Sequence, residues 1–418
     1  MLRDCEKVRA SRNKGAMRME SSQDLIIPRG FRAAAVKSGI KPSGGLDLAL
    51  LAAAGPCAAA GTFTTNRVCA APVRWCRDHL PASDIRAVVV NAGNANAATG
   101  AQGAMNAART AELAGEMLGC RPDQVLVAST GVIGHQLPMD RLEEGLKRVS
   151  SQLSADPGSF QTAAQAILTT DTRAKVVALQ HKGEGGTLTL FGMAKGAAMI
   201  GPRMATMLAF LLTDAPVWPN DLQPILSDAV ENSFNCVSVE GHTSTNDTVL
   251  ILSSTAATEP VLSGDDLTAF AAMVNSACES LARMMAADGE GSTHLITIDV
   301  EGCETREEAR TIARTVADSP LVKTAIHGAD PNWGRIVSAA GYAGVPFEEA
   351  ELSLWINGVA VYQAGVPTAF DASSLSAQLR ANRDVHFRLV LSRGTDRIRF
   401  WTCDLTAEYV RLNADYTT

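Results

Sequence analysis

The chain has 418 residues, 46% hydrophobic and 19% charged, a composition typical of a globular protein with two lobes or one large α/β unit. Its net charge of −7 argues against nucleic acid or an acidic membrane surface as a partner. No apolar run reaches the roughly 18 residues that a membrane-spanning helix needs, so we expect no membrane span.

The cysteines and the N-terminal segment indicate the cellular compartment. The nine cysteines are scattered, and none forms a Cys-x-x-Cys pair. We therefore expect reduced thiols in a cytoplasmic protein, without a disulfide framework or a zinc site. Residues 1–26 are polar, carry both charges and lack the apolar core of a secretory signal, so we expect a disordered tail.

The first part of the chain predicts short strands, one of which is followed by a polar, asparagine-rich stretch. Residues 29–68 combine apolar runs with Gly, Pro and Asn, which favours short strands and turns. Residues 85–90 form a buried strand that leads into the asparagine-rich stretch NAGNANA at 91–97, followed by a helix at 103–118. These asparagines either offer amides to a ligand or support a turn with left-handed backbone, and the residues alone leave both open.

The next strand, at 125–129, ends in Thr130-Gly131. A strand that ends in Thr-Gly leaves free backbone N–H groups beside a hydroxyl, and such donors stabilise the oxyanion of a tetrahedral intermediate. The signal is weak alone, because Thr-Gly turns are common.

Residues 139–168 predict two helices around Asp156-Pro157-Gly158, and these end at the polar cluster Thr169–Thr172. Such a cluster is either a helix cap or a site. A hairpin follows over 176–192, turning at 183–186. Lys195 is then either a solvated loop lysine or a partly buried cation for a substrate carboxylate.

Residues 193–214 place a lone threonine between a segment of small residues and an apolar run. The run at 207–212, MLAFLL, predicts a buried strand, so Thr206 stands at its start. Its hydroxyl needs a base, which its own α-amine supplies, with a pKa of roughly 7.7–8.0, if the chain cuts itself between Ala205 and Thr206. The alternative is an ordinary threonine at the start of a strand.

The stretch after this strand predicts a helix at 221–233 and strands at 236–239 and 249–252, which enclose a polar cluster at 240–248. A long helix begins near Ser263 with an S-x-x-D capping pattern. Glu290 lies between two glycines, so it is either a solvated turn acid or an open contact for the α-ammonium of an amino acid.

The C-terminal third predicts a strand at 294–300, a helix at 305–316 with a Thr305/Glu308 capping box, and a hairpin over 352–362. The hairpin turns at Asn357-Gly358, as a type I′ turn requires. Residues 385–391 and 397–403 suggest a second strand pair. The breaker-rich stretch 327–336 receives no catalytic role.

The stretch KGAAMIGPRMATMLAF at 195–210 resembles the self-cleavage signature of the ornithine acetyltransferase family of arginine biosynthesis, also called glutamate N-acetyltransferase. The resemblance runs from about Ile27 to the last residue. It implies an α/β fold, a layered αββα-type sandwich with mixed sheets. It also implies an α chain (27–205) and a β chain (206–418) after self-cleavage, assembled as two α and two β chains. The activity implied is ping-pong transfer of acetyl from N-acetylornithine to glutamate.

The resemblance also assigns residues. Thr206 is the nucleophile, and Thr130 with Gly131 forms the oxyanion hole. The substrate contacts implied are Thr169, Lys195, Thr206, Glu290, Asn413 and Thr418. Hydroxyls, an amine and hydrogen-bond donors suffice for this chemistry, so no metal or organic cofactor is expected.

Three residues depart from the family pattern. Glu240 and His242 stand where aspartate is expected, and His294 stands where lysine is expected.

Other functions remain open. An amidase or aminopeptidase of the same superfamily would release the acyl group to water. Lys195 could instead form a Schiff base with a carbonyl substrate or pyridoxal phosphate, and an uncut chain would suit a non-enzymatic binding protein. The sequence leaves open whether acetyl-CoA is a second donor.

Overall fold

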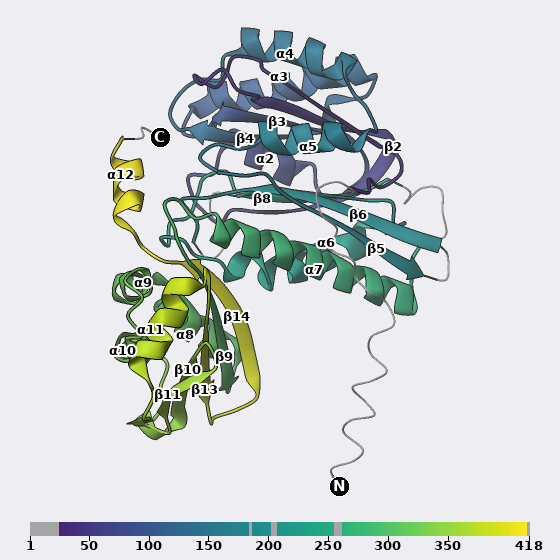
Figure 1. Ribbon diagram of the computed structural model, residues 1–418. Coiled ribbons are helices and arrows are strands. Elements are labelled where there is room, and N and C mark those ends of the chain that lie inside the picture. The colour runs from purple at the N-terminus through teal and green to yellow at the C-terminus, as the bar shows by residue number, and fades with distance from the viewer. Residues whose placement is uncertain (1–24, 184–185, 202–206, 255–260, 416–418) are drawn as a thin grey trace.

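The computed structural model describes residues 25–183, 186–201, 207–254 and 261–415, arranged as a large sandwich and a smaller α/β unit (Figure 1). The sandwich contains strands β1 Phe31–Val36, β2 Leu48–Phe63, β3 Ala82–Asn94, β4 Val125–Val132, β5 Lys175–Gly183, β6 Gly186–Lys195, β7 Leu208–Thr213 and β8 Thr248–Ser253. Its helices are α2 Ala71–Asp78, α3 Gly100–Leu118, α4 Met139–Ser151, α5 Pro157–Ala166, α6 Pro219–Glu231 and α7 Gly264–Ala287.

The eight strands form one mixed sheet in the order β4-β3-β2-β8-β7-β6-β5, with β1 paired to β2. The β3–β4 and β7–β8 pairs are parallel, and the other pairs are antiparallel. The long strand β2 joins two halves of this sheet, since residues 48–53 pair with β1 and residues 58–63 pair with β8. Gly55 and Pro56 lie at the change of partner, where the β2–β3 register shifts and proline is tolerated.

The two halves lie face to face, with helices outside each of them. Alternation along single strands shows this: Leu50 packs with α3 and α4, whereas Leu51 points to a middle core shared by both halves. In β7, Phe210 points to that middle core and Leu211 points outward to α6 and α7. Residues 208–212 of β7 are all apolar because both faces of this strand are buried. This arrangement confirms the predicted αββα layers.

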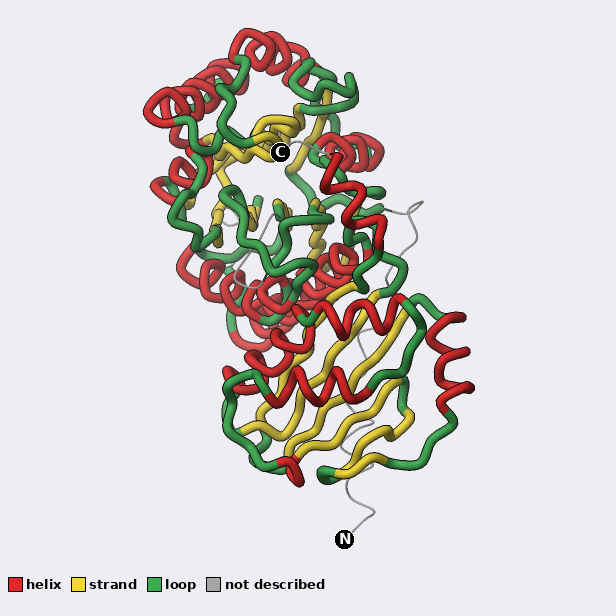
Figure 2. The backbone as a smooth tube through the Cα atoms, turned by 90° about the vertical axis from the view of Figure 1, so that its left-hand side faces the viewer, coloured by secondary structure: helices red, strands yellow, loops and turns green. Residues whose placement is uncertain are grey.

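The smaller unit contains a six-stranded sheet in the order β12-β11-β10-β13-β9-β14. Figure 2 shows its helices across one face of the sheet. Its strands are β9 Leu295–Cys303, β10 Leu352–Ile356, β11 Val359–Gln363, β12 Val366–Pro367, β13 Asp384–Leu391 and β14 Asp396–Cys403. Its helices are α8 Arg306–Asp318, α9 Pro320–His327, α10 Trp333–Gly341 and α11 Ala372–Ala381, and the chain continues into α12 Ala407–Asp415.

Several predicted elements are confirmed. The hairpin at 183–186 joins β5 to β6, although 184–185 lie outside the described residues. The Asn357-Gly358 turn joins β10 to β11 with φ of 48° and 82°, as a type I′ turn requires. Thr305 caps α8, accepting a hydrogen bond from the Glu308 N–H at 3.2 Å. In a complete capping box the Glu308 side chain would accept from the Thr305 N–H. Here Glu308 Oε2 accepts from the Glu304 N–H instead.

Four predictions were wrong. The strands at 385–391 and 397–403 do not pair with each other, because β9 lies between them, parallel to β13 and antiparallel to β14. Residues 236–239 form no strand but follow a short 3-10 helix, with one bridge from Val237 to Trp401. Ser263 precedes α7 without a side-chain capping bond. Only short strands were predicted within 29–68, but this stretch contains the 16-residue strand β2.

Among the described residues, no helix is both long enough and apolar enough to cross a bilayer. The eight described cysteines have free thiols, and Cys5 lies outside the described residues. The predicted N-terminal tail lies outside them up to residue 24, and so does the predicted cleavage junction at Ala205 and Thr206.

Candidate active site

The Thr130-Gly131 pair lies near the end of β4, beside β3. Thr130 pairs with Ala92 and Gly131 with Gly93 in the parallel register. Gly131 has a φ of 133°, and a Cβ there would lie 2.3 Å from the carbonyl carbon of Gly93, so only glycine fits. This close approach fixes the backbone beside the Thr130 hydroxyl, and the Thr130 side chain is itself buried.

Lys195 ends β6, and its Nζ donates to the Thr130 Oγ1 at 3.2 Å. It is 1% exposed. Burial lowers the pKa of Lys195, although the nearby Asp171 carboxylate opposes the shift. Lys195 is therefore a desolvated ammonium group beside a hydroxyl, rather than a solvated loop lysine.

The backbone beside the predicted cleavage site is anchored to the same sheet. Lys195 pairs with Leu208 across the β6–β7 ladder, so the ammonium group belongs to the strand next to the one that follows Thr206. The N–H of Met207, the residue directly after Thr206, donates to the Asp247 Oδ1 at 2.8 Å. Burial raises the pKa of Asp247 to about 8.

A buried ionic network lies behind Lys195. Asp171 Oδ1 accepts from Lys175 Nζ and from the Gly196 N–H, both at 2.6 Å, and its Oδ2 accepts from the Thr169 N–H at 3.2 Å. Lys175 also contacts Asp288 Oδ2 at 2.6 Å. Burial alone would raise the pKa of Asp171, but the charges of Lys195 and Lys175 and two hydrogen bonds hold it below its usual value. The predicted polar cluster at 169–172 is thus part of the site's framework.

Glu290 approaches from the loop after α7. Its N–H donates to the carbonyl of Ala197 at 2.9 Å. Its Oε2 accepts from Asn413 Nδ2 at 2.8 Å, which joins it to the tail helix α12. Gly291 has a φ of 67°, and a Cβ there would lie 2.7 Å from the Tyr409 N, so the tail can approach this loop only because the residue is glycine.

The predicted site residues therefore meet around the segment 195–197. Thr130 Oγ1 contacts Lys195 Nζ, and the Asp171 carboxylate accepts from the N–H groups of Thr169 and Gly196. The Glu290 N–H donates to the Ala197 carbonyl, and the Glu290 carboxylate accepts from Asn413. Ala205, Thr206 and Thr418 lie outside the described residues. An ammonium group, a carboxylate and a hydroxyl in one place suit an amino acid substrate, and the hydroxyl next to a fixed Gly backbone suits oxyanion stabilisation.

The asparagines at 91–96 have internal partners. Asn91 accepts from Ser129 Oγ at 2.6 Å, Asn94 Oδ1 accepts from the Asn96 N–H at 2.8 Å, and Asn96 Nδ2 donates to the Gly103 carbonyl at 2.9 Å. Asn96 also has a φ of 45°. This favours the turn interpretation over direct ligand binding.

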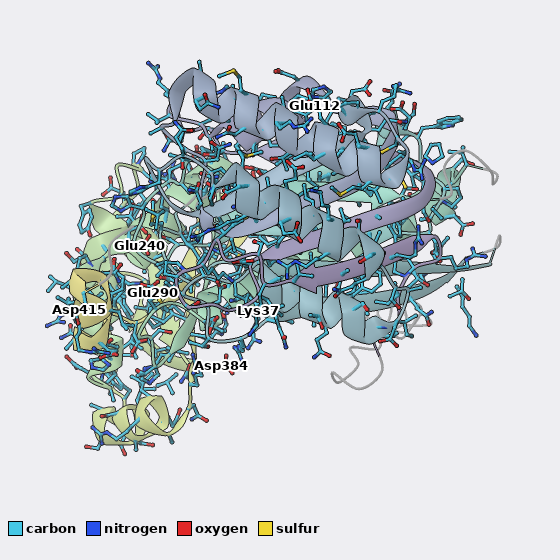
Figure 3. All side chains as sticks on the ribbon, turned by 90° about the horizontal axis from the view of Figure 1, so that it is seen from above. Lys37, Glu112, Glu240, Glu290, Asp384 and Asp415 are labelled. Atoms are coloured by element: carbon cyan, nitrogen blue, oxygen red, sulfur yellow. The ribbon has the colours of Figure 1, made fainter. Side chains whose placement is uncertain are left out.

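The three departures from the family pattern differ in environment. Both carboxylate oxygens of Glu240 are buried without a hydrogen-bond partner among the described residues, and burial raises its pKa to about 8. Glu240 and Glu290 lie on the side of the molecule that carries the tail helix ending at Asp415 (Figure 3). His242 is exposed, whereas His294 is buried against Asp404.

Lys175, Asp288 and Asp404 were not identified from sequence. Lys175 carried one signal, a cation at the start of an apolar strand. Among the described residues, no group of three or more His, Cys, Asp or Glu side chains could hold a metal ion.

Comparison with known proteins places the chain among arginine-biosynthesis proteins. The model of the ArgJ family matches residues 32–418. An arginine biosynthesis bifunctional protein ArgJ from Dehalococcoides mccartyi is 46% identical over 96% of this chain and 100% of its own length. One from Thermosynechococcus vestitus is 42% identical over 94% and 98%. A crystal structure of ornithine acetyltransferase from Mycobacterium tuberculosis, complexed with ornithine, is 41% identical over 44% of this chain and 98% of its own, with a TM-score of 0.42.

Proposed function

This chain belongs to the ArgJ family, and from that premise we propose that it transfers an acetyl group from N-acetylornithine to glutamate. The observation that carries the proposal is that Lys195 Nζ contacts the Thr130 hydroxyl and also lies within electrostatic range of the Glu290 carboxylate. A hydroxyl donor, an ammonium group and a carboxylate are the groups that acyl transfer between amino acids requires. The proposed compartment is the cytoplasm, and the proposed assembly is two α and two β chains.

The proposed first step is self-cleavage. The Thr206 hydroxyl attacks the Ala205 carbonyl, the C–N bond breaks as the C–O bond forms, and the Thr206 nitrogen takes a proton. Water then hydrolyses the ester, which leaves a carboxylate on Ala205 and a free α-amine on Thr206. The products are the α chain ending at Ala205 and the β chain starting at Thr206. The Met207–Asp247 hydrogen bond supports a fixed backbone on the β-chain side of this junction.

The proposed second step loads the enzyme with acetyl. The Thr206 hydroxyl attacks the acetyl carbonyl of N-acetylornithine, and its α-amine takes the proton and passes it to the leaving amine. Thr130 and the Gly131 backbone stabilise the oxyanion. The amine of glutamate then attacks the acetyl-threonine ester, so that N-acetylglutamate leaves and the hydroxyl is restored.

The proposed pocket binds both charges of the amino acid. Lys195 binds the carboxylate and Glu290 the ammonium group, with Thr169, Asn413 and Thr418 completing the pocket. The burial of Lys195 supports this assignment, because an ammonium group removed from water gains more from a substrate carboxylate than a solvated one. Use of acetyl-CoA as a second donor would add an activity at the same nucleophile.

The test is acetyl capture on the β chain. Purified protein is mixed with N-acetylornithine alone, and the peptide that contains Thr206 is measured by mass spectrometry. We expect one acetyl group on Thr206, which disappears on addition of glutamate as N-acetylglutamate forms. Thr206→Ala is the control. Rapid release of free acetate without glutamate would instead indicate an amidase, and absence of any acetylated peptide or product would overturn the proposal.

A further inference from the structure

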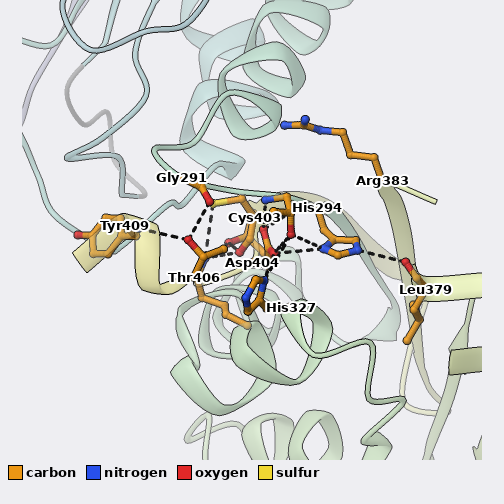
Figure 4. Close-up of polar contacts among 12 residues, drawn as sticks. Gly291, His294, His327, Leu379, Arg383, Cys403, Asp404, Thr406 and Tyr409 are labelled. Atoms are coloured by element: carbon orange, nitrogen blue, oxygen red, sulfur yellow. Dashed lines mark hydrogen bonds and ion pairs between the residues drawn. The ribbon is translucent and has the colours of Figure 1, made fainter. Parts of the chain in front are cut away.

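Asp404 lies at the centre of a polar cluster formed with Thr293, His294 and His327, which we call the Asp404 cluster. Figure 4 shows Asp404 with the two histidines. Asp404 Oδ1 accepts from the N–H groups of Thr293 and His294, both at 2.8 Å. Asp404 Oδ2 accepts from Thr293 Oγ1 at 2.5 Å and faces the Nδ1 atoms of His294 at 3.1 Å and His327 at 3.3 Å. Five groups thus meet one carboxylate.

This carboxylate is fully enclosed, since its side chain is 0% exposed. Burial alone would raise the pKa of Asp404, but hydrogen bonds from Thr293 and His294 outweigh it and hold the pKa below its usual value. The cluster also reaches α11, because His294 Nε2 lies 3.1 Å from the carbonyl of Leu379. A buried charge with this many partners fixes the segments that supply them.

Two of these segments carry groups of the proposed pocket. Thr293 and His294 end the loop that contains Glu290, and Asp404 begins the connection from β14 to α12, which contains Asn413. A second bond joins the two segments, since Thr406 Oγ1 donates to the Gly291 carbonyl at 2.8 Å. The hydrogen bond from Asn413 to Glu290 joins the same two segments again, beside the proposed pocket.

We propose that Asp404 is a positioning residue that holds the Glu290 loop and the tail helix α12 in register, so that Glu290 and Asn413 face the substrate together. His327 acts through Asp404 from the end of α9. This gives a role to the first residue of the stretch 327–336. The inference rests on the proposed function insofar as Glu290 and Asn413 bind the amino acid.

The test compares Asp404→Asn with Asp299→Asn. Asparagine keeps one oxygen for the two backbone N–H groups but places an NH₂ where three side-chain partners meet Asp404. Asp299 is a suitable control, because it is also a buried aspartate of the smaller unit that contacts a histidine, His386 Nε2 at 2.9 Å. For Asp404→Asn we expect KM for N-acetylornithine to rise by about 10- to 100-fold with a smaller change in kcat, as misplacement of binding groups predicts. We also expect faster hydrogen–deuterium exchange in residues 405–415. Asp299→Asn should change neither.

The outcomes separate the two proposals. Wild-type protein without acetyl transfer contradicts the proposed function, whatever the variants do. Active wild-type protein with an unchanged KM in a folded Asp404→Asn variant overturns the role of Asp404, and so does an equal rise in Asp299→Asn.

If Asp404→Asn does not fold, His327→Ala takes its place. The His327 side chain is 44% exposed, so its loss should leave the fold intact. We expect KM to rise about two- to tenfold, the effect of one hydrogen bond. An unchanged KM and unchanged exchange in 405–415 would then overturn the inference.

Discussion

Lys195 Nζ donates to Thr130 Oγ1 across 3.2 Å, and this bond joins strands from the two opposed halves of the sandwich. Thr130 belongs to β4 in one half, and Lys195 ends β6 in the other. The contact places a buried ammonium group beside the hydroxyl that we assign to the oxyanion hole. The residues that we propose for substrate binding and for oxyanion stabilisation are therefore in direct contact.

Thr130→Val tests the hydroxyl. Valine keeps the shape of the side chain but removes the donor, so we expect kcat/KM to fall by about 10²- to 10³-fold. Thr130→Ser should restore most of the activity. Thr213→Val is the matched control, because Thr213 is an equally buried threonine whose hydroxyl donates to the Thr189 carbonyl at 2.8 Å, outside the site. Equal losses in Thr130→Val and Thr213→Val, measured by steady-state kinetics, would contradict the assignment.

Lys195→Met should weaken substrate binding, whereas Lys175→Met should lower the stability of the fold. Lys195→Met removes the proposed carboxylate contact, so KM should rise by about 10-fold or more while the fold persists. Lys175→Met leaves Asp171 and Asp288 buried without their shared cation, so the free energy of unfolding should fall by about 3–5 kcal/mol. Urea unfolding and substrate saturation measure the two quantities. A Lys195→Met protein with normal KM would remove Lys195 from the pocket.

Glu290→Gln tests the ammonium contact. Glutamine preserves the bond from Asn413 but removes the charge, so we expect KM for N-acetylornithine, whose one free ammonium is on its side chain, to rise by about 10-fold. Glu408→Gln is the control, because it removes a charge from α12 where Glu408 pairs with Arg411 on the surface. Similar KM values for the two variants would show that Glu290 does not bind the substrate.

Glu240→Gln tests the pH dependence of stability. The folded-state pKa of Glu240 is raised to about 8 from an ordinary value of 4.5, so its stabilising contribution is fully present below pH 4.5 and is lost as pH rises through 8. Glutamine cannot ionise. We therefore expect Tm of the wild type to fall relative to Glu240→Gln between pH 6 and pH 9, as measured by thermal unfolding at both pH values. A constant difference in Tm would contradict the raised pKa.

Local patterns in the sequence predict most of the elements, because helix period, strand period and turn residues act over short distances. Asn357-Gly358 specifies its own hairpin in this way. Strand partners are less local: β13 and β14 are close in sequence, yet each pairs with β9, which comes some 80 residues before β13. Gly and Pro usually end a strand, but Gly55 and Pro56 lie inside β2, where this single strand changes partner.

The residues of the candidate site also differ in whether a local sequence pattern indicates them. Thr130, Lys195 and Glu290 were identified because they lie in motifs that resemble a family. Asp288 was not, since its ionic partner Lys175 is 113 residues away and no local pattern indicates the pair. Asp404 was missed for the same reason, because its partners come from the start of β9 and the end of α9.

We propose that Thr206 becomes an N-terminal nucleophile, and the intact mass of the denatured protein shows whether it does. For wild-type protein we predict two fragments that join at Ala205 and Thr206, and for Thr206→Ala a single uncut chain. Activity in the acetyl-transfer assay should accompany cleavage. A single uncut wild-type chain that still transfers acetyl would contradict the account, because the α-amine base could not then exist.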